Sequence, residues 1–261
     1  MRKLKKLLLL AQIAFHDPTQ AFDRVSALLE IYLNQWLFNE KPNACLTFGE
    51  FLKLLPLEFA TYAEEGEKEL SKIIANFMDA TKKLSSLPFP ISYNADHSLA
   101  ILCYAFVRWL KPEIVLETGV GYGISSSIIL TALRYNGVGQ LISIDLPPLG
   151  DYKGNFVGLA VPHILREKWT LKRGNARRLL PEIVNNLPVI DMFLSDSANI
   201  YTLQRFEFEQ IFKKMSSRGV CVFDNISLNM LRYLAGIEGL QLWTLKQEEK
   251  QGCFTGILMK K

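Results

Sequence analysis

The sequence predicts an α/β protein with a doubly wound, mostly parallel sheet, preceded by a helical N-terminal region. From residue 111 onward, short apolar runs alternate with stretches of helical periodicity, as in strands joined by crossover helices. One run, residues 113–127 (EIVLETGVGYGISSS), leads through an acid into three alternating glycines. Glycines at this spacing indicate a sharp strand-to-helix turn, where a ligand can lie against the backbone.

Seven segments are expected to form the strands of this sheet. They are residues 114–117, 141–145, 170–173, 190–195, 220–224, 240–245 and 252–259. Helices are expected between them, among them residues 96–109, 122–135 and 228–234. No helical stretch separates the last two strands, so we expect the sheet to end in a closing strand pair.

The first third of the chain reads as helical. Residues 17–87 carry apolar side chains at helical spacing, with Thr47 able to cap a short helix through residue 55 and a longer helix over residues 63–84. The prolines of SSLPFP, residues 85–90, break this pattern. We therefore divide the chain into residues 1–87, a helical cap or oligomerisation region, and residues 88–261, the α/β domain.

The N-terminus imitates a secretory signal, because MRKLKKLLLLAQIAF has a basic start and an apolar run. It lacks a cleavage site and is too short to span a bilayer, and Asp17 with Pro18 forms a good helix start directly after it. We expect an amphipathic helix that packs on the protein. Contact with a membrane surface through its lysines remains the alternative.

Composition limits the function classes. The 261 residues are 49% hydrophobic with a net charge of +4, too mild a charge to indicate nucleic acid. The four cysteines form no C-x-x-C pair, which favours a reduced, cytoplasmic protein, and no stable membrane insertion is expected. With three histidines in the chain, any metal is expected to have oxygen ligands.

Polar residues stand where the predicted strands end, the edge at which such sheets bind ligands. Asp145 ends the second strand, where a carboxylate can accept two hydrogen bonds from a ribose diol or else cap a helix. Asn175 follows the third strand and can read an adenine edge, although Asn after Gly is also common in loops. The other strands end at Glu117, Asp196 and Asp224.

The motifs ETGVGYG, ISID, RGNA, IDMFLSDSANIY and VCVFDNI, in this order, resemble the class I S-adenosylmethionine-dependent methyltransferases. Residues 90–261 carry the resemblance, and VPHILREKWTLKRGNARRLLPEI with FEFEQIF is similar to a bacterial small-molecule subgroup. The resemblance implies a Rossmann-like seven-stranded sheet with a reversed last strand, and methylation of a small-molecule acceptor, at oxygen. The cofactor-binding residues that it implies are Glu117, Gly119, Gly121, Tyr122, Gly123, Asp145, Leu146, Asn175, Ala176 and Asp196.

Within this set, the resemblance assigns Glu117 and the glycine backbone to the methionine end of the cofactor. It assigns Asp145 to the ribose and Asn175 with Ala176 to the adenine side.

Asp196, Asp224 and Asn225 also resemble the ligand set of the catechol O-methyltransferase type, in which a divalent cation binds the substrate hydroxyls. Two carboxylates and an amide suit Mg²⁺ or Ca²⁺, and the cation would lower the pKa of the acceptor hydroxyl. Asp196 and Asp224 are accordingly the expected catalytic residues. In metal-independent relatives the same acids bind cofactor or cap a helix, so the cation stays one of two readings.

One position departs from the resemblance. Asn199 stands where related proteins carry His or Lys, and an amide cannot take a proton at neutral pH. Tyr201, His97, His163 or a metal-bound hydroxyl could substitute as the base. Methyl transfer to a good nucleophile can also proceed largely through positioning.

Two other functions compete with methyl transfer. A nicotinamide-dependent oxidoreductase shares the glycine turn but expects G-x-G-x-x-G, and here Gly123 comes one residue early. A cofactor-binding module without catalysis, acting through residues 1–85, is motivated by Asn199. The same N-terminal helices would form the contact of a homodimer.

Overall fold

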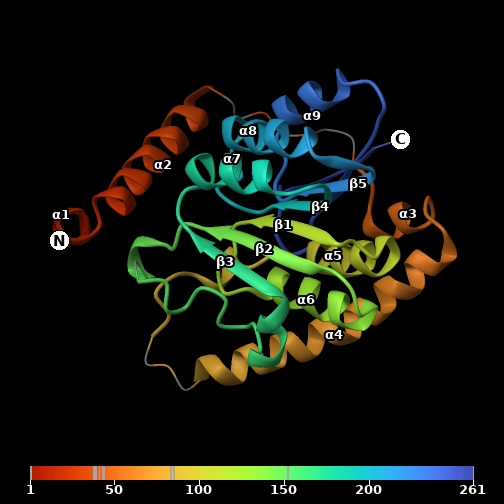
Figure 1. Ribbon diagram of the computed structural model, residues 1–261, viewed down its shortest axis with the longest axis horizontal. Helices are drawn as coiled ribbons and strands as arrows, with labels where there is room; N and C mark the ends of the chain where they lie inside the picture. The colour runs from red at the N-terminus through yellow and green to blue at the C-terminus, as the bar shows by residue number, and fades with distance from the viewer. Residues whose placement is uncertain are drawn as a thin grey trace.

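The fold is a single seven-stranded sheet between two layers of helices, with two further helices at the N-terminal side (Figure 1). The computed structural model describes residues 2–37, 40, 42, 45–82, 84, 86–151 and 153–260. The strand order is β3-β2-β1-β4-β5-β7-β6. Strands β1 to β5 pair in parallel, and β7 lies antiparallel between β5 and β6. The predicted doubly wound sheet with a reversed last strand is confirmed.

The strands are β1 (Ile114–Thr118), β2 (Gln140–Asp145), β3 (Trp169–Arg173), β4 (Ile190–Ser195), β5 (Met215–Phe223), β6 (Leu240–Lys246) and β7 (Phe254–Lys260). The α-helices are α1 (Arg2–His16), α2 (Pro18–Leu37), α3 (Phe48–Leu52), α4 (Leu57–Lys82), α5 (His97–Leu110), α6 (Ile124–Asn136), α7 (Ala176–Asn186), α8 (Tyr201–Phe212) and α9 (Leu228–Ala235). Short 3-10 helices lie at Ile91–Tyr93, Leu149–Asp151 and His163–Lys168.

Each face of the sheet has its own hydrophobic core. Helices α4, α5 and α6 pack together on one face, and α5 is buried along nearly its whole length. Helices α7, α8 and α9 cover the other face (Figure 1). The parallel strands are therefore apolar on both sides, as the unbroken apolar runs of the sequence indicate.

Helix α4 joins the core of the sheet, because Phe59, Leu70 and Phe77 are buried in the same cluster as α5 and α6. It begins six residues before the predicted start at residue 63, directly after Pro56. The division of the chain between residues 87 and 88 stays a prediction. Residues 83 and 85, beside that predicted boundary, lie outside the described part of the chain.

Other predicted element ends lie within a few residues of the observed ones. Thr47 is the N-cap of α3 in a capping box with Glu50, as predicted, but α3 ends at Leu52 rather than residue 55. Strand β5 begins at Met215 rather than residue 220, because the polar stretch before Gly219 continues the strand. The predicted strand was too short because apolar runs alone were used to place it, and these first residues of β5 are mostly polar.

Helix α2 lies beside the carboxyl ends of β2 and β3, and α1 packs against α2 (Figure 1). Helix α2 begins at Pro18, and Asp17 Oδ1 accepts from Gln20 N at 2.9 Å, so the predicted helix start is confirmed. The expectation that the first helix packs on the protein holds only in part. Ile13 is buried and α1 contacts α2, but Leu8 and Phe15 are 64% and 85% exposed.

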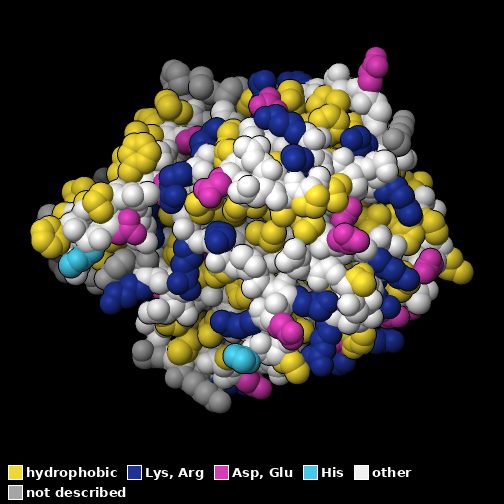
Figure 2. Space-filling view, in the orientation of Figure 1, with side chains coloured by type: hydrophobic (Ala, Val, Ile, Leu, Met, Phe, Trp, Pro, Cys, Tyr) yellow, Lys and Arg dark blue, Asp and Glu magenta, His cyan; other side chains and the backbone are white. Residues whose placement is uncertain are grey.

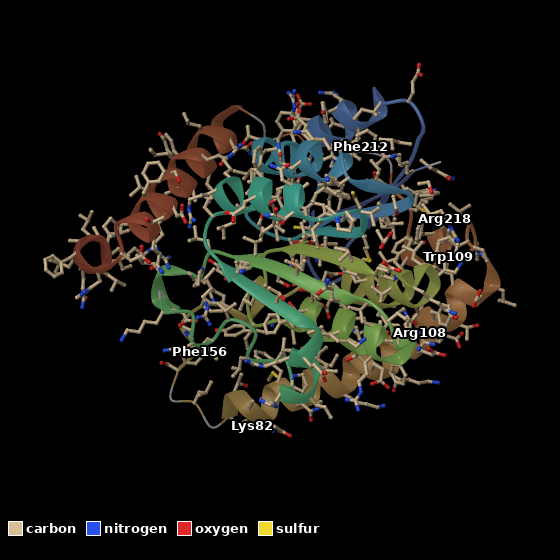
Figure 3. All side chains as sticks on the ribbon, viewed as in Figure 1. Lys82, Arg108, Trp109, Phe156, Phe212 and Arg218 are labelled. Atoms are coloured by element: carbon tan, nitrogen blue, oxygen red, sulfur yellow. The ribbon has the colours of Figure 1, made fainter. Side chains whose placement is uncertain are left out.

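The two edges of the sheet have different surroundings. At the amino edge, Arg218 of β5 lies over the ring of Trp109 at the end of α5, whereas Phe156 marks the loop beyond the carboxyl end of β2 (Figure 3). The predicted site lies on the Phe156 side. Among the described residues, no helix has the length and apolar character needed to cross a membrane.

Candidate active site at the carboxyl edge of the sheet

The predicted site residues meet at the carboxyl edge, because backbone hydrogen bonds tie the strand ends together. Gly119 N donates to Ile144 O at 2.9 Å, and Asp196 N donates to Thr118 O at 2.8 Å. Asp224 N in turn donates to the oxygen of Ser195 at 2.8 Å. The ends of β2, β1, β4 and β5 thus form one continuous rim.

The three glycines of the turn all have positive φ, at +83° for Gly119, +53° for Gly121 and +87° for Gly123. A Cβ on Gly119 would lie 2.0 Å from Asp196 O, and one on Gly123 would lie 2.8 Å from the Cα of Gly158. At Gly121, the nearest atom would be Tyr93 O at 3.5 Å. Two of the glycines are therefore required by the chain itself, and Gly121 is the one with space beside it.

Asp145 has one oxygen engaged and one free. Its Oδ1 accepts from Val120 N at 2.9 Å and more distantly from Gly121 N at 3.5 Å. Its Oδ2 is buried without a hydrogen-bond partner among the described residues. Burial raises the pKa of this carboxyl to about 6. A buried acceptor without a donor is costly, so the arrangement fits a ligand hydroxyl at this position.

Glu117 is engaged by the protein itself. Ser125 Oγ donates to Oε1 at 2.7 Å, and the hydroxyls of Ser126 and Ser143 donate to Oε2 at 2.6 Å each. Burial raises the pKa of Glu117 above its usual value despite these bonds. The carboxylate therefore joins β1, β2 and α6, and its predicted contact with the methionine end of a cofactor stays a prediction.

Tyr122 lies in the core on the α4 side of the turn. Its ring stacks on Phe89 with 3.9 Å between ring centroids, and its hydroxyl donates to Phe89 O at 2.6 Å. The side chain is fully buried. Any contact that Tyr122 makes with a cofactor would thus come from its backbone.

Helix α2 covers the predicted adenine side. Asn175 Oδ1 caps α7 by accepting from Arg177 N at 2.9 Å, while Asn175 N donates to Asp23 Oδ2 at 3.0 Å. Arg178 also pairs with Asp23, with 2.6 Å between Nη2 and Oδ2. The polar groups of Asn175 are therefore engaged by α2 and α7, which the sequence did not indicate.

The end of β2 is also in contact with α2. Arg24 is 6% exposed, and its Nη1 donates to Pro147 O at 2.6 Å, while its Nε has no partner among the described residues. Burial lowers the pKa of the Arg24 guanidinium, although Asp145 is near enough to oppose the shift.

A pocket lies between α2 and the strand ends. It is lined by Asp17, Thr19, Gln20, Asp23, Leu146, Pro147, Arg173, Gly174 and Arg178. Of the predicted cofactor-binding residues, Leu146 lines this pocket, and Ala176 of the predicted adenine side is the buried first residue of α7.

The acids after β4 and β5 form a second group. Asp224 is buried, and its Oδ2 accepts from Asn199 Nδ2 at 2.8 Å while its Oδ1 accepts from Gln247 Nε2 at 2.5 Å. The ammonium of Lys250 lies 3.7 Å from Asp224 Oδ2. Burial, with the carboxylate of Asp224 beside it, raises the pKa of Asp196 well above its usual range.

This group does not fit the predicted divalent cation. Both oxygens of Asp224 already accept from amide donors, and a Lys ammonium lies where a second cation would be repelled. Asn225 does follow Asp224 in a left-handed conformation, with φ of +44°. The sequence predicted Asp196 and Asp224 at the strand ends, where the structure has them, but it did not reveal the donors around them.

The side chains that the sequence offers as a general base lie in different parts of the structure. His97 begins α5, where its Nε2 lies 2.8 Å from Glu67 Oε2, and His163 begins an exposed 3-10 helix. Tyr201 begins α8, two residues after Asn199. Asn199 itself has φ of +54°, a conformation that Asn tolerates better than most residues.

Around the acids after β4 and β5, sequence reasoning missed three residues. Gln247 and Lys250 come from the β6–β7 loop, KQEEKQG, whose charges read as an exposed hairpin. Glu207 of α8 is fully buried and accepts from Ser195 Oγ at 2.7 Å and Ser197 Oγ at 3.1 Å. Within FEFEQIF this acid stands between two phenylalanines, and that apolar surrounding could have indicated a buried carboxyl.

Comparisons with known proteins agree with this geometry. Residues 116–226 match a family model described as a methyltransferase domain. The search of curated proteins gave no match.

Solved structures share the fold at low sequence identity. A putative O-methyltransferase from Klebsiella pneumoniae is 15% identical with a TM-score of 0.57, over 74% of this chain and 89% of that one. An O-methyltransferase from Bacillus cereus in complex with SAH is 14% identical with a TM-score of 0.54, over 81% and 96%. The O-methyltransferase TomG from Streptomyces achromogenes in complex with SAM is 16% identical with a TM-score of 0.54, over 89% and 96%. This chain thus has the fold of these methyltransferase structures, and its residues 116–226 match the methyltransferase domain model.

Proposed function

We propose that the protein transfers the methyl group of S-adenosylmethionine to a hydroxyl oxygen of a small molecule. The observation that carries this proposal is the buried Oδ2 of Asp145, which has no hydrogen-bond partner among the described residues. It lies at a strand end, beside the glycine turn. Similar folds were solved with SAM or SAH bound, including those from Bacillus cereus and Streptomyces achromogenes. The methyltransferase domain match supports the same reaction.

The residues that would hold the cofactor follow from the geometry. Asp145 Oδ2 would accept from a ribose hydroxyl, and the backbone at Gly121 leaves room for the ligand. Leu146 would flank the adenine side from the pocket wall. The cofactor supplies a methyl group bound to a positively charged sulfur, which an acceptor oxygen can attack.

The acceptor side lies at the ends of β4 and β5. We assign Asp196 and Asp224 to it, with Asp224 held in place by Asn199 and Gln247. Fixing the acceptor oxygen in line with the methyl group supplies much of the rate enhancement in such reactions. No divalent cation enters this proposal, because the donors around Asp224 leave no fitting site.

The test is transfer of labelled methyl from S-adenosylmethionine to a panel of phenols, catechols, sugars and amines. We expect O-methylation of at least one hydroxyl acceptor, with activity retained in EDTA. A protein that binds the cofactor yet methylates no member of the panel would instead support the non-catalytic binding module.

Helices α1 and α2 are assigned to a homodimer contact. The outer face of α2 carries apolar side chains in one stripe, with Phe22 71%, Leu29 59% and Tyr32 71% exposed. Figure 2 shows apolar side chains gathered on this projecting part of the molecule. A second copy of the same face would remove this area from water.

The chemistry of the cysteines supports a cytoplasmic location. Cys45, Cys103, Cys221 and Cys253 are all free thiols, as expected in a reducing compartment.

A further inference from the structure

The β6–β7 loop brings a cation to the acceptor side of the site. Gln247 and Lys250 both approach Asp224, at 2.5 Å and 3.7 Å respectively. The loop is anchored at the start of α5, where Glu249 N donates to Asp96 Oδ2 at 3.2 Å and His97 N donates to Glu249 Oε2 at 3.2 Å. These backbone contacts fix the loop, so the position of Lys250 follows from the fold.

The groups around Lys250 have unused hydrogen-bonding capacity. A separation of 3.7 Å from Asp224 is longer than a hydrogen bond, so the three ammonium donors are available to a ligand. Gln247 is 5% exposed, and within the described chain its Oε1 has no donor. The Oδ1 of Asn199 is likewise buried without a partner there. Buried acceptors left open beside a cation indicate a polar ligand.

Lys250 supplies a positive charge beside the acids of the site. Asp224 faces the ammonium of Lys250 across 3.7 Å, so it offsets that positive charge only in part. Asp196 is the other carboxyl near Lys250, whose ammonium opposes the rise in the pKa of Asp196. A ligand oxygen next to Lys250 therefore meets one positive charge that is only partly compensated.

Resting on the proposed methyl transfer, we propose that Lys250 binds the acceptor oxygen in place of a divalent cation, and that the acceptor is an acidic hydroxyl of the phenol class. The ammonium donates to that oxygen and stabilises its anion, while the hydroxyl proton is released to water. The oxygen lone pair then forms the O–C bond as the bond from methyl carbon to sulfur breaks, with its electron pair remaining on sulfur. Lys250 keeps its proton throughout, so Asn199 need not act as a base.

The experiment follows the ionisation of 4-nitrophenol by its absorbance in the presence of the protein, with and without S-adenosylhomocysteine and in EDTA. We expect the wild-type protein to lower the apparent pKa of the bound phenol by about one unit, because a positive charge lies within reach of its oxygen. Lys250→Met should abolish the shift and Lys250→Arg should retain most of it. Lys246→Met, which removes the same charge from an exposed position on β6, should behave as wild type.

Calorimetry with S-adenosylhomocysteine separates this inference from the proposed function. Lost phenol ionisation in Lys250→Met with unchanged S-adenosylhomocysteine affinity confirms an acceptor role. A wild-type protein that leaves 4-nitrophenol unshifted or unbound, a Lys250→Met variant that shifts it equally, or a shift that requires added Mg²⁺ overturns the role of Lys250. Failure of the wild-type protein to bind S-adenosylhomocysteine contradicts the proposed function instead.

Discussion

At the scale of single residues, the acids that end the strands have unlike roles. Glu117 and Asp145 both lie at the carboxyl ends of buried strands. Glu117 accepts from three serine hydroxyls, whereas Asp145 keeps a buried oxygen without a donor among the described residues. The difference comes from neighbours that fold alongside, such as Ser143 on β2. An unsatisfied oxygen therefore distinguishes Asp145, the acid proposed to bind a ligand, from Glu117, which is held by the protein itself.

Glu207 gives a prediction at the same scale. Burial raises its pKa from 4.5 to about 7, against the hydrogen bonds from Ser195 and Ser197. The folded protein thus holds a proton that the unfolded chain releases. The contribution of Glu207 to the free energy of unfolding is therefore fully present below pH 4.5 and is lost as the pH rises through about 7. This difference corresponds to about 3 kcal/mol.

Unfolding free energies of wild type and Glu207→Gln, compared at about pH 5 and about pH 8, measure this effect. The wild type should lose more stability over that interval than the variant does. Glu209→Gln on the same helix is the matched control, since Arg205 lowers the pKa of Glu209 and the sign is opposite. Equal pH dependence in wild type and Glu207→Gln would show that Glu207 is ionised in the folded protein.

At the scale of elements, α2 has two different faces. Its inner face is polar, with Asp23 and Glu30 paired to Arg178 and Arg177 of α7. Its outer face is the exposed apolar stripe that contains Phe22 and Leu29. One face fixes the helix beside the pocket at the carboxyl edge, and the other is the face proposed for the homodimer contact.

Sedimentation velocity tests the homodimer. Wild type should sediment as a species of about twice the chain mass of 29.7 kDa, and Phe22→Asp should shift it to a monomer because the charge cannot be buried in the contact. Ile164→Asp changes an equally exposed apolar side chain on the 3-10 helix after Pro162 and should leave the dimer intact. A wild-type monomer, or a Phe22→Asp dimer, would argue against this contact.

At the scale of the whole molecule, the sequence predicts the order of strands and helices, because hydrophobic periodicity and polar strand ends indicate it directly. Residues 190–195 were placed correctly as β4, and the closing strand pair was recognised from the missing helix. Residues brought in from distant loops could not be predicted in this way. Lys250 and Asp23 look like ordinary surface charges in the sequence, and only packing brings them to Asp224 and Asn175.

The glycines illustrate the same limit. Their spacing predicted the turn, but the close approach of Asp196 to Gly119 depends on how β4 lies beside β1. Glu117, Tyr122 and Asn175 have their side chains engaged within the protein, which no motif states. Motifs thus indicate where the site lies, whereas three-dimensional packing decides which of its polar groups remain without a partner inside the protein.

Calorimetric titration with S-adenosylhomocysteine tests the central claim most directly. Wild type should bind it and not NADH, and Asp145→Asn should bind at least about tenfold more weakly, because an amide nitrogen replaces the oxygen that accepts the ribose hydroxyl. Asp191→Asn is the control, since Asp191 accepts from Glu113 N and Ile114 N at the amino edge and should leave affinity unchanged. Binding of NADH alone, or equal affinity in wild type and Asp145→Asn, would contradict the account.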